Sequence, residues 1–166
     1  LIAIALFLII VIASIFGIKP AVKSGSFDNI SLPPGFKIDV FADALDGSSL
    51  SYPGPNPGPR MMLLKDNVLF VTIPNLGKVV ALPDENKDKK ADGVITFIDK
   101  LKNPHGIDHY DGWFYIAEEN RVIRVKESGN SIQSDLKTFQ VLIDNLPTGG
   151  HFTRTIKIHN NSLYLS

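Results

Sequence analysis

Hydrophobic and polar positions follow a pattern that occurs three times along the chain. Each copy opens with a strand-like segment that closes on an aspartate and a leucine, at Val40–Leu45, Thr96–Leu101 and Val141–Leu146. Each then reaches a second hydrophobic segment with an aromatic residue at its centre, at Phe70, Tyr115 and Tyr164. A repeat of about 45 to 50 residues built from short strands is typical of the blades of a β-propeller. The pattern therefore predicts an all-β fold, namely a partial β-propeller with about two and a half blades.

One polar residue stands at the same register in every copy, ten residues before the central aromatic residue, at Arg60, His105 and Arg154. Every second side chain of a strand points to the same face of its sheet. The following positions on that face are mostly apolar, as at Met62, Ile107 and Ile156. We therefore expect the polar residues to share one surface at an end of the sheets, and the apolar residues to pack between blades.

The hydrophobic runs also predict how the strands pair. Met61–Val71 is expected to be a strand that pairs in antiparallel fashion with Lys78–Leu82. The second copy repeats this arrangement with Ile107–Ile116 and Arg121–Val125. After Ile18 there is no sustained helical period with capping residues, which favours an all-β domain.

The chain begins with a hydrophobic segment that differs from the rest. Residues 1–18 carry no charge and are almost wholly apolar, and about 18 such residues are enough for a transmembrane helix. We interpret 1–18 as a helical membrane anchor, or as a signal segment if it is cleaved; 19–31 as a linker; and 32–166 as an incomplete propeller domain. Since the chain lacks an initiating Met and three repeats do not close a ring, we expect it to be the N-terminal part of a longer protein. Either role of the hydrophobic segment places the domain outside the cytoplasm.

Composition excludes some classes of function. The sequence has 17 basic and 17 acidic residues and no long basic run interleaved with aromatic residues. A nucleic-acid partner is not expected, because phosphate neutralisation needs a clustered positive face. The sequence has no Cys, so neither disulfides nor thiolate catalysis are available to it.

The strongest local signal for chemistry is the segment Leu146–Thr155. Two glycines, Gly149 and Gly150, permit a sharp turn and a close approach of the backbone to a ligand. His151 follows at once, and an imidazole is well suited to accept a proton near neutral pH. Arg154 stands three residues further on, and its fork of donors suits an anionic partner. Two interpretations remain open: a catalytic base with an anion-binding group, or a histidine that caps the turn and an arginine in a structural ion pair.

A second segment has the spacing of a calcium loop. Asp84, Asn86 and Asp88 occupy positions 1, 3 and 5, with Asp92 at position 9. Alternate oxygen ligands of this kind can converge on one Ca²⁺ ion. Lys89 stands where such loops usually have Gly, and a charged, solvated hairpin loop is the alternative interpretation.

Several motifs resemble the soluble quinoprotein sugar dehydrogenases, the glucose/sorbosone dehydrogenase family. They are Leu32–Phe36, the repeated aspartate–leucine strand ends, Asn103–Gly106 and especially Leu146–Thr155. The resemblance covers roughly residues 32–166. It implies a six-bladed propeller that binds pyrroloquinoline quinone, with calcium, at one end of the central channel.

The resemblance also implies roles for individual residues. His151 matches the general base that takes the proton of the sugar's anomeric hydroxyl while hydride passes to the quinone. His105, Arg60 and Arg154 become candidate contacts of the cofactor or substrate. The ion beside the quinone would take its ligands from residues beyond Ser166, so calcium at Asp84–Asp92 would be a separate, structural ion. Gly150 departs from the family, whose glucose-oxidising members often carry an acidic residue there.

Three functions are therefore considered. The leading one is a membrane-anchored, extracytoplasmic oxidoreductase that uses pyrroloquinoline quinone to oxidise an aldose or sugar aldehyde; the sequence does not specify its electron acceptor. The alternative is a non-catalytic extracytoplasmic propeller that binds a ligand or protein, because fold does not fix function. A calcium-dependent lactone hydrolase is disfavoured, since its acidic metal ligands have no obvious counterparts in this sequence.

Overall fold

The computed structural model describes residues 27, 29–43, 45, 58–129 and 132–166. The chain divides into two units, Leu1–Val40 and Phe41–Ser166, and all described strands belong to the second. The helix predicted for residues 1–18 lies outside the described residues. Within the described ranges, no helix is long and apolar enough to cross a membrane.

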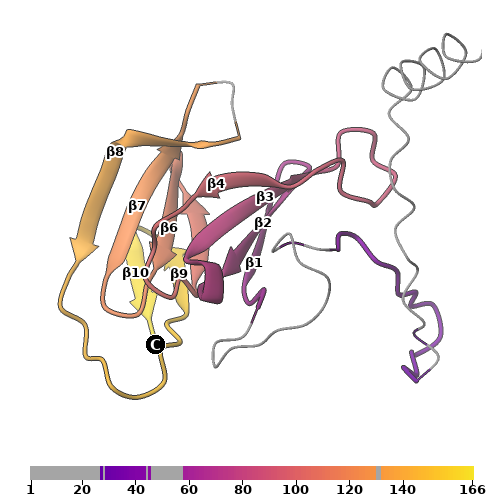
Figure 1. Cartoon of the computed structure of the whole chain (residues 1–166), viewed down its shortest axis with the longest axis horizontal. Helices are drawn as coiled ribbons and strands as arrows, with labels where there is room; N and C mark the ends of the chain where they lie inside the picture. Colours follow the sequence, from indigo (N-terminus) through magenta and orange to yellow (C-terminus); the bar gives the residue numbers. More distant parts are fainter. Residues whose placement is uncertain (1–26, 28, 44, 46–57, 130–131) are drawn as a thin grey trace, which may run out of the picture. The chain divides into compact units, whose positions relative to one another are not determined.

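The second unit consists of two four-stranded antiparallel sheets and one β-hairpin (Figure 1). Sheet 1 contains β1 (Met62–Lys65), β2 (Val68–Ile73), β3 (Lys78–Pro83) and β4 (Ile95–Ile98), with the short 3₁₀ helix η1 (Pro74–Leu76) between β2 and β3. Sheet 2 contains β5 (Ile107–Tyr110), β6 (Trp113–Ala117), β7 (Val122–Glu127) and β8 (Ser134–Ile143). The third hairpin is β9 (Ile156–His159) with β10 (Ser162–Leu165). Strands follow one another in chain order within each sheet, so the all-β, partial propeller fold is confirmed.

The segments expected to be single strands are in fact hairpins. Met61–Val71 bends back on itself, and Met62 of β1 pairs with Val71 of β2. The turns hold two residues each and begin at Asp66, Asp111 and Asn160, whose φ angles are 47°, 48° and 47°. Asp and Asn tolerate this left-handed conformation and are favoured in two-residue hairpin turns. The constant spacing between the polar and aromatic residues therefore spans a tight turn.

The first copy of the opening segment also differs from the prediction. Val40–Leu45 forms no strand among its described residues. Phe41 and Leu45 instead pack against the apolar face of sheet 1 that contains Val71 and Val80. The backbone carbonyl of Phe41 accepts a hydrogen bond from Ala91 N at 2.8 Å. This segment thus covers a sheet face rather than adding a strand.

The main core lies between sheets 1 and 2. Phe70, Phe97 and Phe114 form a triangle of rings with centroids 4.6 to 5.1 Å apart, a favourable geometry for aromatic pairs. On the other face of sheet 2, Tyr115 and Ala117 pack against the hairpin β9–β10. Because alternate residues of β6 point to opposite faces, this strand is buried on both sides.

The predicted packing between blades holds for two of the three copies. Ile107 packs in the core shared with sheet 1, and Ile156 packs against sheet 2. In the first copy, Met62 and Leu64 are 66% and 72% exposed. The predicted face of these apolar residues is therefore correct, but each of them is buried only where a neighbouring sheet packs against that face.

A buried carboxylate links the second and third hairpins. Asp108 on β5 is 3% exposed, and its carboxylate accepts hydrogen bonds from Ile158 N at 2.6 Å and Lys157 Nζ at 3.0 Å. Both donors lie on β9. A buried carboxylate requires hydrogen-bond partners, and because both partners of Asp108 come from β9, they fix the lateral position of β9 against β5.

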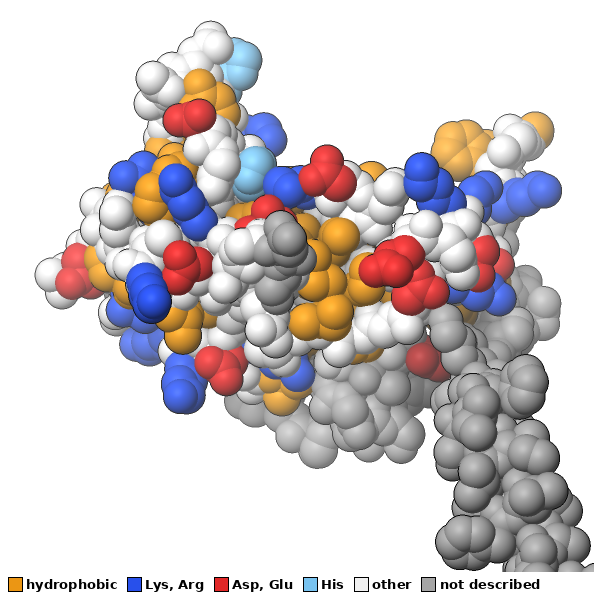
Figure 2. Space-filling model, turned by 90° about the horizontal axis from the view of Figure 1, so that it is seen from above, with side chains coloured by type: hydrophobic (Ala, Val, Ile, Leu, Met, Phe, Trp, Pro, Cys, Tyr) orange, Lys and Arg blue, Asp and Glu red, His pale blue; other side chains and the backbone are white. Residues whose placement is uncertain are grey.

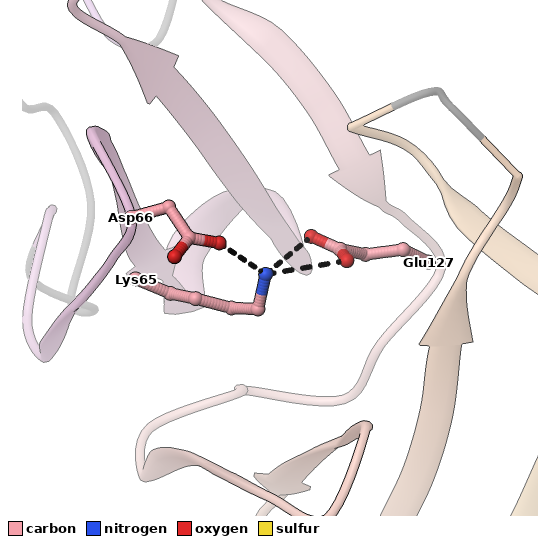
Figure 3. Close-up of polar contacts among 3 residues, drawn as sticks. All are labelled: Lys65, Asp66 and Glu127. Atoms are coloured by element: carbon pink, nitrogen blue, oxygen red, sulfur yellow. Dashed lines mark hydrogen bonds and ion pairs between the residues drawn. The ribbon is translucent and has the colours of Figure 1, made fainter.

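A polar cluster joins sheets 1 and 2 at their hairpin-turn ends. Figure 3 shows Lys65 of β1 between the carboxylates of Asp66 and Glu127, with Nζ–oxygen distances of 2.7 and 3.4 Å. The hydrogen bond that Lys65 donates to Asp66 raises the pKa of Lys65, and the same bond lowers the pKa of Asp66. Nearby, burial lowers the pKa of His109, and the positive charge of Lys65 lowers it further; the carboxylates of Glu127, Asp108 and Asp66 act in the opposite direction.

The lowered pKa of His109 predicts a loss of stability at acidic pH. The imidazole of an unfolded chain titrates near pH 6.5, so below about that pH the unfolded state takes up the proton first and the free energy of unfolding falls. Above it, this contribution is fully present. We expect His109→Gln to lose less stability than the wild type between about pH 7 and pH 5, measured by urea unfolding.

One further variant and one shared residue make this comparison specific. His105, whose pKa is also lowered, is present in both proteins and does not cause a difference between them. His159→Gln, at an exposed position of β9, controls for the substitution itself. Parallel stability–pH curves for the wild type and His109→Gln would contradict the prediction.

Candidate active site

The three polar residues selected by register stand at the same place in each hairpin. Arg60, His105 and Arg154 each lie two residues before their strands, β1, β5 and β9. Arg60 N donates to Thr72 O at 3.0 Å, and His105 N donates to Ala117 O at 2.8 Å. The third hairpin extends its pairing in a similar way beyond β9. The strand starts therefore form equivalent positions at one end of the sheets.

Hydrogen bonds connect these strand starts from one hairpin to the next. The hydroxyl of Thr72, the pairing partner of Arg60, donates to the backbone carbonyl of His105 at 2.9 Å. His105 Nδ1 lies 3.2 Å from the backbone carbonyl of Arg154. A carbonyl can only accept, so Nδ1 carries the proton. The three hairpins are thus joined through residues at or beside the predicted site.

His105 occupies the centre of this group. Its side chain is buried, and the ring of Phe152 meets it edge to face with centroids 6.2 Å apart. Burial lowers the pKa of His105, and the positive charge of Arg60 lowers it further, while the hydrogen bond to the carbonyl of Arg154 acts in the opposite direction. The imidazole is therefore neutral at neutral pH.

Arg154 holds the shape of its own loop. Its guanidinium donates to the carbonyls of Pro147, His151 and Thr153. Gly149 has a φ of 98°, a conformation that glycine adopts at no steric cost. Among the described residues, the contacts of the Arg154 guanidinium are thus with backbone carbonyls within the loop rather than with a carboxylate of another blade. His151, in the middle of this loop, is exposed.

An ion pair with a buried carboxylate lies beside the site and was not predicted from the sequence. Glu118 is 0% exposed, directly after β6. Its carboxylate accepts hydrogen bonds from Arg121 Nε and, at 2.5 Å, from Lys102 N. Glu119 N donates to Lys102 O at 3.0 Å, so both residues hold the loop that carries His105. A glutamate directly after an apolar strand and three residues before Arg121 was the available signal.

The predicted calcium loop turns its oxygen atoms toward its own backbone. Asp84 accepts hydrogen bonds from Asp88 N and Lys89 N, both at 3.1 Å. Asn86 Oδ1 accepts from Asp88 N at 2.9 Å, and Asp92 accepts from Glu85 N at 2.7 Å. Lys89 has a φ of 68° at the usual glycine position. In the part of the chain that is described, no three His, Cys, Asp or Glu side chains are grouped as metal ligands. Calcium at this loop stays a prediction.

Calcium titration tests that prediction directly. If Asp84, Asn86, Asp88 and Asp92 bind the ion, Ca²⁺ at about 10⁻⁴ to 10⁻³ M should raise the Tm, because the ion then binds only the folded loop. Asp84→Asn should remove the increase, and Asp99→Asn, at an exposed position after β4, should keep it. An unchanged Tm in the wild type at millimolar Ca²⁺ would contradict the site.

A pocket of about 460 Å³ lies elsewhere, between sheet 2 and the third hairpin. Tyr110, Trp113, Tyr115 and Leu163 contribute to its walls, along with the turn residue Asp111. It is therefore near the hairpin turns, at the end opposite the strand starts that carry His105. Figure 2 looks toward this turn end and shows acidic and basic side chains interspersed around a small hydrophobic group.

Comparison with known proteins identifies structural relatives. The sequence matches no model of a known family and no curated protein. Two solved structures of a carbohydrate-active enzyme of family AA12 from Trichoderma reesei, an iodide and a calcium structure, are 22% identical with a TM-score of 0.57, covering 66% of this chain and 29% of theirs. The holo form of the pyranose dehydrogenase PQQ domain from Coprinopsis cinerea is 19% identical with a TM-score of 0.53, over 64% of this chain and 26% of that one. The chain thus spans less than a third of these structures, and the likeness at this identity concerns the fold.

Proposed function

We propose that this chain belongs to an oxidoreductase that uses pyrroloquinoline quinone to oxidise an aldose or a related sugar aldehyde. The observation that carries the proposal is the convergence of His105, Arg154 and the His151 loop at one end of the sheets, linked by hydrogen bonds. A structural neighbour that is a PQQ domain of a pyranose dehydrogenase supports the same cofactor and substrate class.

The residues present fit a planar, anionic cofactor. Arg60 is exposed, and Arg154 adds a second positive charge at the same end of the sheets, although its donors also hold loop carbonyls. Guanidinium groups suit carboxylates, so Arg60 and Arg154 would hold the quinone. When bound, the quinone supplies an acceptor for hydride from the sugar carbon.

His151 is the group proposed to move the proton. Its exposed imidazole can accept the proton of a sugar hydroxyl, which leaves the oxygen lone pair free to form the carbonyl of the product. The loop that carries it is held by the Arg154 guanidinium through the carbonyls of Pro147 and Thr153. Such positioning matters because proton transfer requires hydrogen-bond distance between base and hydroxyl.

The cellular setting of this proposal follows from the hydrophobic segment 1–18. As an anchor it would tether the domain to a membrane on the extracytoplasmic side, and as a cleaved signal it would release it. Calcium, beside the quinone or at the loop Asp84–Asp92, is part of the same proposal.

Reconstitution tests the function. The purified protein is mixed with pyrroloquinoline quinone and Ca²⁺, and oxidation of D-glucose, D-galactose, D-xylose and L-arabinose is followed with an artificial electron-accepting dye. We expect dye reduction only when protein, quinone and sugar are all present. Rates that do not change when the quinone is added would overturn the proposal.

A non-catalytic binding module is the second candidate. Gly150 favours it, because the resemblance leads us to expect an acidic residue directly before His151. Calorimetry with the same four sugars separates the two functions: heat of binding without quinone-dependent dye reduction supports the binding module.

A further inference from the structure

One of the two ring nitrogens of His105 has no hydrogen-bond partner among the described residues. Nδ1 donates to the carbonyl of Arg154, whereas Nε2 makes no hydrogen bond to any described residue. Among the described residues, every buried side-chain nitrogen or oxygen has a hydrogen-bond partner. Nε2 must therefore lie where solvent reaches it, at the edge of an otherwise buried ring.

The tautomer of this ring is fixed by its partner. Because the carbonyl of Arg154 accepts only, Nδ1 bears the proton and Nε2 presents a lone pair. The lowered pKa of His105 agrees with a neutral ring. A neutral imidazole in this tautomer accepts a hydrogen bond from a hydroxyl at Nε2, and a quinone or carboxylate oxygen has no proton to offer it.

Hydrogen bonds of the neighbouring backbone also restrict the orientation of the ring. His105 N is bonded to Ala117 O, and Gly106 O accepts from Ala117 N, both at 2.8 Å. The loop before His105 is fixed by the buried carboxylate of Glu118 through Lys102 N. Together with Thr72, which binds the carbonyl of His105, these contacts leave the ring little freedom to turn its Nε2 edge away.

We propose that His105 is a substrate-binding residue whose Nε2 accepts a hydrogen bond from a hydroxyl of the sugar, distinct from the proton-accepting role of His151. The proposal rests on the proposed function for the identity of the ligand as a polyhydroxyl compound. The fixed tautomer follows from the protein alone. A hydrogen bond of this type contributes about 1 kcal/mol, which corresponds to about a fivefold change in affinity.

Nitrogen NMR tests the tautomer without any activity. Long-range ¹H–¹⁵N spectra of labelled protein, assigned with His105→Gln, should show His105 in the Nδ1–H form at pH 7. At pH 6.5, where a free histidine is about half protonated, it should remain mostly neutral. An Nε2–H form, a mixture of tautomers, or a largely protonated ring at pH 6.5 would overturn the inference.

The ligand is tested with the same four aldoses in the same spectra. A sugar that binds should shift the Nε2 resonance of His105, and shifts confined to other residues would overturn the assignment.

Steady-state kinetics of a variant test the same hydrogen bond. His105→Asn retains a donor near the position of Nδ1 and lacks an acceptor at the position of Nε2, so its KM should rise about fivefold with kcat changed less. His109→Asn, four residues along and near Lys65, Asp66 and Glu127, is the matched control and should keep the wild-type KM.

Failure of this inference is distinguishable from failure of the proposed function. A wild-type protein that binds an aldose with a shift at His105 but reduces no dye refutes the dehydrogenase and supports the assignment of Nε2. A protein that oxidises the sugar while His105→Asn keeps both wild-type KM and fold supports the dehydrogenase and refutes the assignment.

Discussion

Replacing His151 with Gln is expected to lower kcat for quinone-dependent sugar oxidation by about 10² to 10⁴-fold, the usual contribution of a positioned general base. Gln keeps a polar side chain of similar reach but does not accept a proton at neutral pH. Because His151 is exposed, the substitution should leave the free energy of unfolding within about 0.5 kcal/mol of the wild type. Steady-state kinetics and urea unfolding measure the two effects.

The matched control for this prediction is His159→Gln. His159 is also an exposed histidine of the third hairpin, at the end of β9 beside the turn, and its replacement should not affect kcat. If His151→Gln oxidises sugar at the wild-type rate, His151 is not the base.

Replacing Gly106 with Ala is expected to destabilise the protein by about 1 to 3 kcal/mol, the usual cost of an overpacked site. A Cβ atom at this position would lie 2.5 Å from Arg154 O and 2.8 Å from Ile156 N. Both are backbone atoms, so the start of the third hairpin must move. The same movement would displace the hydrogen bond of His105 to Arg154 O and the loop of His151. Since a misplacement of about 1 Å can cost about 10²-fold in rate, kcat/KM should fall together with stability.

Gly93→Ala separates this steric effect from the loss of a glycine. Nothing lies within 4 Å of a Cβ at Gly93, so its stability and kcat/KM should match the wild type. If Gly106→Ala also retains the wild-type Tm and kcat/KM, the close approach of the second and third hairpins is not required for the site.

The repeated register of the strands was predicted from the sequence, but the hairpins were missed. A two-residue turn at Asp66 keeps the alternation of apolar and polar residues nearly continuous from β1 to β2, so Met61–Val71 reads as one strand. The turn also reverses which face each position occupies: Phe70 pairs with Leu63 and not with a residue on the face of Met62. The Asp-Gly pair at Asp111 was the clearest turn signal in the sequence.

The common placement of the three candidate site residues could be predicted from the same repeat. Arg60, His105 and Arg154 could be selected because each occupies one register of a repeat, and their common placement follows from the repeat itself. Asp108 and Glu118 were missed, because a carboxylate in a strand pattern is usually exposed. Their burial depends on partners that packing brings to them, at Ile158 for Asp108 and at Lys102 for Glu118.

By itself, the sequence determined the all-β class, the repeat and the end of the sheets at which the polar strand starts gather, because these depend on local alternation and on spacing. Only the tertiary structure decided which side chains touch: the carbonyl of Arg154 that fixes the tautomer of His105, the backbone against Gly106 and the buried partners of Asp108. These contacts join residues about 50 positions apart. The geometry of these contacts is set by how the sheets pack, and the local propensities of the residues do not determine that packing.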